Sequence, residues 1–153
     1  EIATGIATTL AVGAGVFFYP TGIATDGVYL YVADSYRHTI RKIDMATNIV
    51  TTLAGSGGWG KAVDGIGTRA GFWTPNDIVI DGTHLYVADT GSNTIRKIEI
   101  ATGAVTSLAG RGSIGSADGV GTAAQFNNPT GITTDGFSLF VTDTENNTIR
   151  KIE

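Results

Sequence analysis

The pentapeptide Thr-Ile-Arg-Lys-Ile occurs three times in this chain of 153 residues. Each copy begins five residues after an aspartate, and the three aspartates are Asp34, Asp89 and Asp143. Their spacing is 89 − 34 = 55 residues and then 143 − 89 = 54 residues. A period of this length predicts a repeat architecture, with room in each unit for four strands and a long loop.

Four short segments of the middle repeat are rich in β-branched and aromatic residues, which predicts strands. They span residues 76–80, 84–88, 94–98 and 104–108. In the second segment Leu85 and Val87 alternate with Tyr86 and Ala88, so both faces are apolar and must be covered. Stacking antiparallel four-stranded sheets around an axis covers both faces. The sequence therefore predicts an all-β protein, a β-propeller with three blades per chain.

Recurring aspartates are expected to have structural roles. Asp-Gly pairs at Asp26, Asp81 and Asp135 join the first two strands of each unit, and this pair supplies the positive φ that a tight hairpin turn needs. The second set is Asp34, Asp89 and Asp143. Their carboxylates are expected to accept backbone N–H groups of the turn that follows. We predict no catalytic residue in either set.

The segment from Pro75 to Ile98, with its copies after Pro20 and Pro129, resembles the NHL repeat. In that family the second strand ends in Ala-Asp, and the third opens after an Asn-His-like dipeptide. The matching positions are Ala33-Asp34 with Arg37-His38, Ala88-Asp89 with Ser92-Asn93, and Thr142-Asp143 with Asn146-Asn147. The resemblance implies a propeller. It implies no single activity, because the family includes scaffolds, RNA-binding proteins and lyase-like enzymes.

Charge and composition argue against two classes of partner. The net charge is −4, and the three Arg-Lys pairs are dispersed one per repeat, which we interpret as charges at blade edges. Nucleic-acid affinity needs accumulated positive charge, so we expect no nucleic-acid partner. No apolar run approaches the ~18 residues of a membrane span, so we expect no membrane partner. The chain has no cysteine, which leaves its compartment open.

The ends of the repeat pattern predict how the ring closes. We expect one blade at residues 20–55, a second at 75–110 and a partial blade at 129–153. Residues 1–11 match a fourth strand, since their opening Glu-Ile-Ala-Thr-Gly recurs at residues 99–103. Propellers have about 4–8 blades, so three cannot close a ring. We expect a six-bladed homodimer in which residues 5–10 of one chain complete the partial blade of its partner by strand exchange.

The loops between blades depart from the repeat and carry the predicted ligand-binding residues. Phe17, Phe72 and Phe126 recur near the loop ends, and we predict that they are buried anchors. Other aromatic and charged residues have no counterparts in the sister loops and suit a binding surface. Together with residues predicted to lie beside them on the same face, the candidates are Trp59, Trp73, Arg111, Phe18, Tyr19, Arg37 and His38.

A polar pair at the start of the middle blade is a candidate cation site. Asn76 and Asp77 replace the Thr-Gly of the other two blades, at a strand expected to line the central channel. Their oxygens could hold Ca²⁺ or Mg²⁺, or Asp77 could cap a neighbouring turn. We expect no other cofactor.

The function expected from these features is a non-catalytic binding or scaffold module for a protein or carbohydrate. Two alternatives stay open: a metal-dependent lyase-like or lactonase-like enzyme that uses the channel, and an RNA-binding NHL domain.

Overall fold

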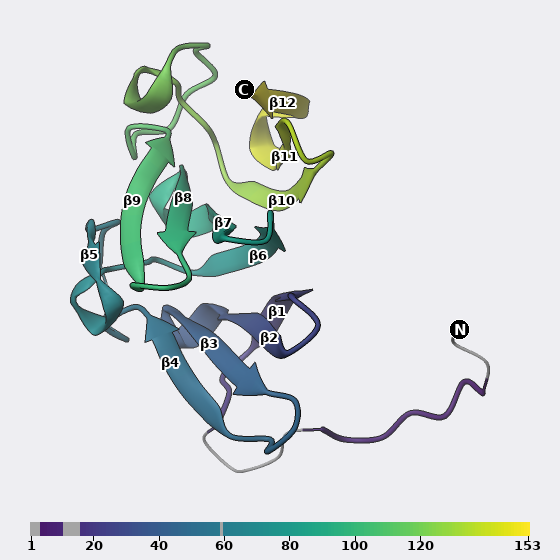
Figure 1. Cartoon of the computed structure of the whole chain (residues 1–153). Coiled ribbons are helices and arrows are strands. Elements are labelled where there is room, and N and C mark those ends of the chain that lie inside the picture. The colour runs from purple at the N-terminus through teal and green to yellow at the C-terminus, as the bar shows by residue number, and fades with distance from the viewer. Residues whose placement is uncertain (1–3, 11–15, 59) are drawn as a thin grey trace.

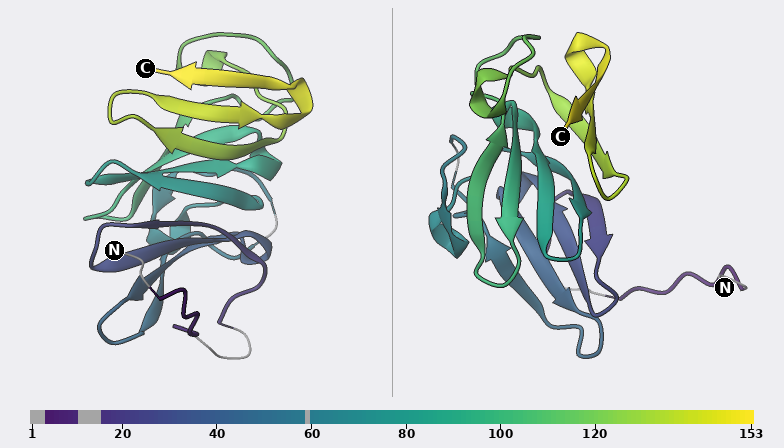
Figure 2. Two further views of the ribbon diagram at one scale, coloured as in Figure 1. Left: turned by 90° about the vertical axis from the view of Figure 1, so that its right-hand side faces the viewer. Right: turned by 45° about the horizontal axis from the view of Figure 1, so that its top comes forward.

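The computed structural model describes residues 4–10, 16–58 and 60–153. It contains three antiparallel sheets, which are stacked along the chain as consecutive blades (Figures 1 and 2). Blade 1 consists of β1 (Pro20–Thr25), β2 (Tyr29–Asp34), β3 (Thr39–Asp44) and β4 (Val50–Ala54). The predicted all-β propeller architecture, with three blades in the chain, is confirmed.

Blades 2 and 3 repeat this strand order, but blade 2 has a fifth strand and blade 3 has three strands among the described residues. Blade 2 consists of β6 (Pro75–Ile80), β7 (His84–Asp89), β8 (Thr94–Glu99) and β9 (Ala104–Ala109), and the short strand β5 (Gly65–Ile66) pairs with β9 as a fifth strand. Blade 3 consists of β10 (Pro129–Thr134), β11 (Leu139–Asp143) and β12 (Thr148–Ile152). The described connections between strands contain five 3-10 turns: η1 (Ser35–Arg37), η2 (Gly67–Arg69), η3 (Thr90–Ser92), η4 (Gly121–Ala123) and η5 (Thr144–Asn146).

The Asp-Gly hairpins form as the sequence predicts. Oδ1 of Asp26 accepts the N–H groups of Val28 at 2.8 Å and Tyr29 at 2.7 Å, and Gly27 has a φ of 89°. Asp81 and Asp135 make the same bonds in blades 2 and 3. These aspartates are turn residues, which fixes the register of the first two strands of each blade.

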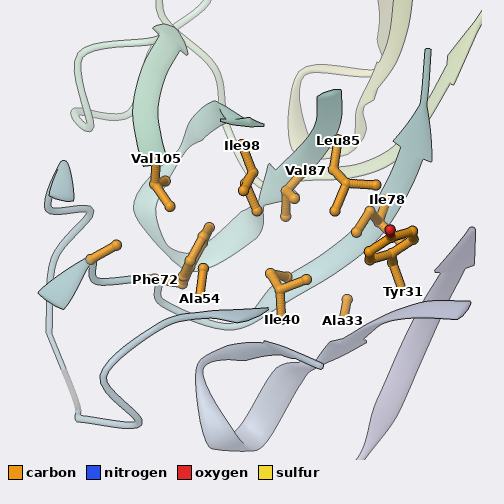
Figure 3. Packing of buried hydrophobic residues seen from close by; sticks show 11 residues of the cluster. Tyr31, Ala33, Ile40, Ala54, Phe72, Ile78, Leu85, Val87, Ile98 and Val105 are labelled. Atoms are coloured by element: carbon orange, nitrogen blue, oxygen red, sulfur yellow. The ribbon is translucent and has the colours of Figure 1, made fainter. Parts of the chain in front are cut away.

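Two hydrophobic clusters hold the blades together, one at each interface. Figure 3 shows the cluster between blades 1 and 2, where Ile40 of β3 meets Leu85 and Val87 of β7. Ala88 and Ile95 belong to the second cluster, between blades 2 and 3. Side chains of one strand point alternately to the two faces, so β7 serves both interfaces. This explains its lack of polar alternation, and full burial of each such side chain contributes about 1.5–3 kcal/mol.

Candidate functional site

A repeated buried frame fixes the loop that enters each blade. In blade 2, Oδ1 of Asp89 accepts the backbone N–H of Trp73 at 2.8 Å. Arg96 donates to the carbonyl of Gly71 at 2.8 Å, and its guanidinium lies 5.2 Å from the ring centre of Phe72. Asp89 and Arg96 therefore hold the loop on both sides of the phenylalanine. We call this the Asp–Arg–Phe frame; its members are Asp34, Arg41 and Phe17, then Asp89, Arg96 and Phe72, then Asp143, Arg150 and Phe126.

The frame corrects two expectations about charge. Asp34, Asp89 and Asp143 accept backbone N–H groups from the loop before the first strand, 16 residues earlier, instead of backbone N–H groups from the turn that follows them. The following turn contributes a side-chain bond, from Nδ2 of Asn146 to Oδ2 of Asp143 at 2.8 Å. The arginines of the pentapeptides are not blade-edge charges, since Arg96 has no exposed side-chain surface. The signal was present in the sequence: an arginine recurs seven residues after each aspartate, inside an apolar strand.

Burial shifts the titration of this frame. Desolvation raises the pKa of Asp89 to about 7, although Arg96 Nη1 lies 3.7 Å from its Oδ2 and opposes the shift. Desolvation also raises the pKa of Asp34 above its usual value. Arg96 has a second carboxylate, because its Nη2 donates to Oδ1 of Asp64 at 2.8 Å. The frame of blade 2 is thus buried and supports the loop from inside. Side chains of the surrounding loops are the ones that a ligand could contact.

A hollow of about 480 Å³ lies over the frame of blade 2, and it contains two of the predicted ligand-binding residues. Trp73 and Arg111 both line it, together with Lys61 and η3. Trp73 is 41% exposed, and Arg111 is held by a 2.8 Å bond from its Nε to Oγ of Ser113. Hydroxyl groups complete the wall; they belong to Ser92, Thr94, Ser107, Ser113 and Thr122. We call this site the Trp73 hollow.

Gly91 keeps the Trp73 hollow open. A Cβ atom at Gly91 would lie 2.7 Å from the carbonyl oxygen of Trp73 and 2.9 Å from its Cγ. Blade 1 has Tyr36 at this position, and its ring lies 5.5 Å from Phe18 and 5.0 Å from Tyr19. Because blade 2 has glycine at this position, the space that the Tyr36 side chain occupies in blade 1 is accessible in blade 2.

The structure separates the predicted ligand-binding residues into two places. Phe18 and Arg37 line a hollow of about 370 Å³ over the frame of blade 1, and Tyr19 packs on Tyr36 at its side. That hollow is the blade 1 counterpart of the Trp73 hollow. Trp59 lies outside the described residues.

His38 does not face either hollow. Its side chain is buried, and its Nδ1 accepts the N–H of Thr74 in the next blade at 2.9 Å. Desolvation lowers its pKa. This burial corrects the expectation that His38 contacts ligand; it is a link between blades, and Asn93 makes the same link to the N–H of Asn128 at 2.8 Å.

Asn76 and Asp77 also link blades. Oδ2 of Asp77 accepts the N–H of Ile132 at 2.9 Å, its Oδ1 accepts that of Ile78, and Asn76 donates to the carbonyl of Thr130 at 3.0 Å. Within the described ranges of this single chain, no group of three or more His, Cys, Asp or Glu could hold a metal ion. The cation site at Asp77 stays a prediction that depends on groups from elsewhere.

Comparisons with known proteins show which sequences this chain is similar to. No protein-family model matches the chain. The chain is 33% identical over 149 residues to Protein SUPPRESSOR OF QUENCHING 1, chloroplastic, of Arabidopsis thaliana, covering 90% of this chain and 14% of that protein. It is 37% identical over 94 residues to NHL repeat-containing protein 2 of Homo sapiens, covering 59% of this chain and 13% of that protein.

Solved structures agree on the architecture. An auxiliary nutrient binding protein from Bacteroides thetaiotaomicron matches with a TM-score of 0.73 and 29% identity, over 86% of this chain and 36% of that one. Virginiamycin B lyase from Staphylococcus aureus matches with a TM-score of 0.53 and 18% identity, over 88% of this chain and 41% of that one, which shows the fold alone. The chain thus spans less than half the length of each of these four proteins. Its blade topology and its similarity to a named NHL repeat-containing protein lead to one conclusion: the chain is built of NHL-type β-propeller repeats.

Proposed function

We propose that this chain is a non-catalytic binding module that takes an anionic protein or carbohydrate ligand in the Trp73 hollow. The observation that carries the proposal is the charge of the hollow. Lys61 and Arg111 line it, no Asp or Glu does, and neither cation makes an ion pair within the described part of the chain. The protein as a whole is acidic, at −4, so this local positive charge would attract an anion.

The repeat itself supports a binding role. The Asp–Arg–Phe frame is kept in all three blades, whereas the residues above it change from Phe18, Tyr36 and Arg37 to Trp73, Gly91 and Ser92. A constant scaffold with a variable lining is how folds carry different ligand sites. The Bacteroides relative in fold and sequence is named a nutrient binding protein, which is compatible with this role.

Trp73 and Arg111 would have different tasks in such a site. An exposed indole offers a flat apolar face, and aromatic side chains are the usual energetic anchors of binding sites. A guanidinium donates two parallel hydrogen bonds to a carboxylate or sulfate. Ser113 holds Arg111 on the rim of the hollow and so reduces the cost of ordering it.

The test compares oligogalacturonate, a neutral galactose oligomer and a polyglutamate peptide as probes in titration calorimetry. We expect an acidic probe to bind and the neutral oligomer not to bind. Trp73→Ala should weaken binding about tenfold or more, and Arg111→Gln should weaken it and reduce its salt dependence. Phe137→Ala is the control, because Phe137 is 94% exposed in the turn between β10 and β11, at the other end of the strands. Binding that survives both hollow variants but not the control would refute the site.

We further propose that the blades work in a six-bladed ring made by two copies of the chain. Three blades leave two sheet faces uncovered, and a ring of about 4–8 blades removes such faces. A two-fold dimer would carry two Trp73 hollows on one surface, which favours an extended or repetitive ligand through avidity.

A further inference from the structure

The outer edges of blades 2 and 3 differ by one strand. In blade 2, β9 lies between β8 and β5, with Lys97 opposite Thr106 and Gly65 opposite Val105. In blade 3, β12 is the last strand of the sheet among the described residues. Beside it lies a cavity of about 480 Å³, lined on one side by residues 150–153 and on the other by residues 118–121. We call this cavity the β12 slot.

Both walls of the β12 slot are already in place. Gly119 and Val120 correspond in the repeat to Gly65 and Ile66 of β5. The loop that carries them is fixed by Arg150, whose Nη2 donates to Oδ1 of Asp118 at 2.7 Å and to the carbonyl of Ala117 at 3.2 Å. Arg96 holds Asp64 in the same way next to β5. Among the described residues, no strand lies between the two walls, and Val120 is 93% exposed.

One segment of this chain has the sequence and the turn that the slot needs. Residues 5–10 read Gly-Ile-Ala-Thr-Thr-Leu, and residues 103–108, which lead through β9, read Gly-Ala-Val-Thr-Ser-Leu. The glycines share a left-handed conformation, with φ of 64° at Gly5 and 71° at Gly103. Residues 4–10 are exposed throughout and extend away from the blades in Figure 1. They are therefore available to pair elsewhere.

The two outer blade faces are open among the described residues, as the proposed two-copy ring requires. Ile149 of blade 3 is 69% exposed, whereas its counterparts Ile40 and Ile95 are completely buried by the next blade. Ile23 of blade 1 is 60% exposed, whereas its counterparts Ile78 and Ile132 are buried by the preceding blade. Among the described residues, no blade covers the Ile149 face of blade 3 or the Ile23 face of blade 1.

Packing of blade 1 of a second copy against blade 3 would cover both exposed blade faces and the outer edge of β12. When blade 1 of a second copy packs on blade 3, the segment before that blade 1 arrives beside β12. The polar link between blades would recur as well: His38 and Asn93 accept the N–H of the residue before the next proline, and Asn147 would accept that of Tyr19 in the second copy.

We propose that residues 6–10 of a second copy enter the β12 slot as its fourth strand, with Thr8 opposite Lys151 and Ala7 opposite Ile152. This register is that of β9 against β8, where Thr106 faces Lys97 and Val105 faces Ile98. The inference rests on the proposed two-copy ring and adds the contact that closes it.

Two neighbouring substitutions test the slot by sedimentation of the whole chain. Ala7 corresponds to Val105, which is buried, and Thr8 corresponds to Thr106, which is exposed. Ala7→Lys should place a charge in the core and raise the dissociation constant at least about tenfold. Thr8→Lys, one residue away on the solvent side, should leave it unchanged. Neither side chain is buried in the described chain, so neither change should prevent folding.

Cysteine pairs then test the register and the source of the strand. The chain has no cysteine, so Thr8→Cys with Lys151→Cys should form two equivalent disulfides between the copies, one in each β12 slot, and oxidation should yield a covalent dimer. Thr9→Cys with Lys151→Cys is the control, because its thiols point to opposite faces. A disulfide within one chain would overturn the proposal.

The outcomes separate the two proposals. A monomer near 15.8 kDa at all concentrations would refute both the ring and the slot. A dimer that withstands Ala7→Lys and forms no cross-link would refute the slot and leave the ring standing.

Discussion

Blades 2 and 3 carry closely similar strand sequences but lie in different environments. Ile95 and Ala88 of blade 2 are buried, whereas their counterparts Ile149 and Thr142 of blade 3 are exposed. The arginine of the frame is fully buried in blade 2 and 13% exposed in blade 3. The difference teaches that a blade in this fold is completed by its neighbours: the same residues become a core only when a strand lies outside them and a sheet lies beside them.

The largest expected effect concerns the frame of blade 2. Arg96→Met should cost about 3–5 kcal/mol of unfolding free energy, because it leaves the buried Asp89 without its cation. Arg41→Met should cost less, because Arg41 is 14% exposed and Asp34 keeps a second cation, since Nε of Arg37 lies 3.6 Å from its Oδ2. Equilibrium denaturation in urea at fixed protein concentration measures both. Equal losses of unfolding free energy in the two variants would show that burial of the arginine does not determine how much the frame stabilises its blade.

The second prediction compares the same isoleucine in two environments. In the Ala7→Lys background, at a protein concentration where sedimentation shows a monomer, Ile95→Ala should cost about 2–5 kcal/mol of unfolding free energy through the cavity it leaves. Ile149→Ala should change stability by no more than about 0.5 kcal/mol, as is usual at an exposed position. In the unmodified chain Ile149→Ala should also weaken the proposed dimer. A large loss at Ile149 in the monomer would mean that blade 3 is covered by its own chain.

The third prediction uses the pKa of Asp89. A carboxyl whose folded pKa is raised from 3.8 to about 7 binds protons more tightly in the folded state. Its contribution to stability is therefore present below about pH 4 and is lost as pH rises to about 7. Asp89→Asn keeps an acceptor for the Trp73 N–H and should remove this decline. Thermal unfolding of parent and variant from pH 4 to 8 tests it, and parallel curves would contradict the raised pKa.

The smallest expected effect is at His38. Its folded pKa lies below the usual 6.5, so its contribution to stability is present above that pH and is lost as pH falls through the folded pKa. His38→Asn should flatten this acid limb, because Asn93 makes the same bond between blades 2 and 3 without titrating. Melting temperatures between pH 5 and 7 provide the measurement. If the variant loses as much stability in acid as the parent, His38 is not the titrating group.

The sequence predicted the features that recur and missed those that depend on environment. Blade number, the Asp-Gly turns and the burial of Phe72 and Phe126 follow from periodicity and turn chemistry, and all appear in the structure. Burial of Arg96 did not follow, because an arginine in a strand normally lies at the surface. The sequence groups His38 with the ligand-binding residues because the repeat pattern does not show that its Nδ1 accepts the backbone N–H of Thr74 in the next blade.

Hydrogen exchange of β12 against β8, read by mass spectrometry at several protein concentrations, tests most directly whether a second copy completes blade 3. The outer amides of β8 bond to β9 in the same chain, so their protection should not depend on concentration. Those of β12 should be weakly protected in dilute protein and approach the protection of β8 as the concentration rises. Rapid exchange of β12 at every concentration, beside a protected β8, would contradict the account.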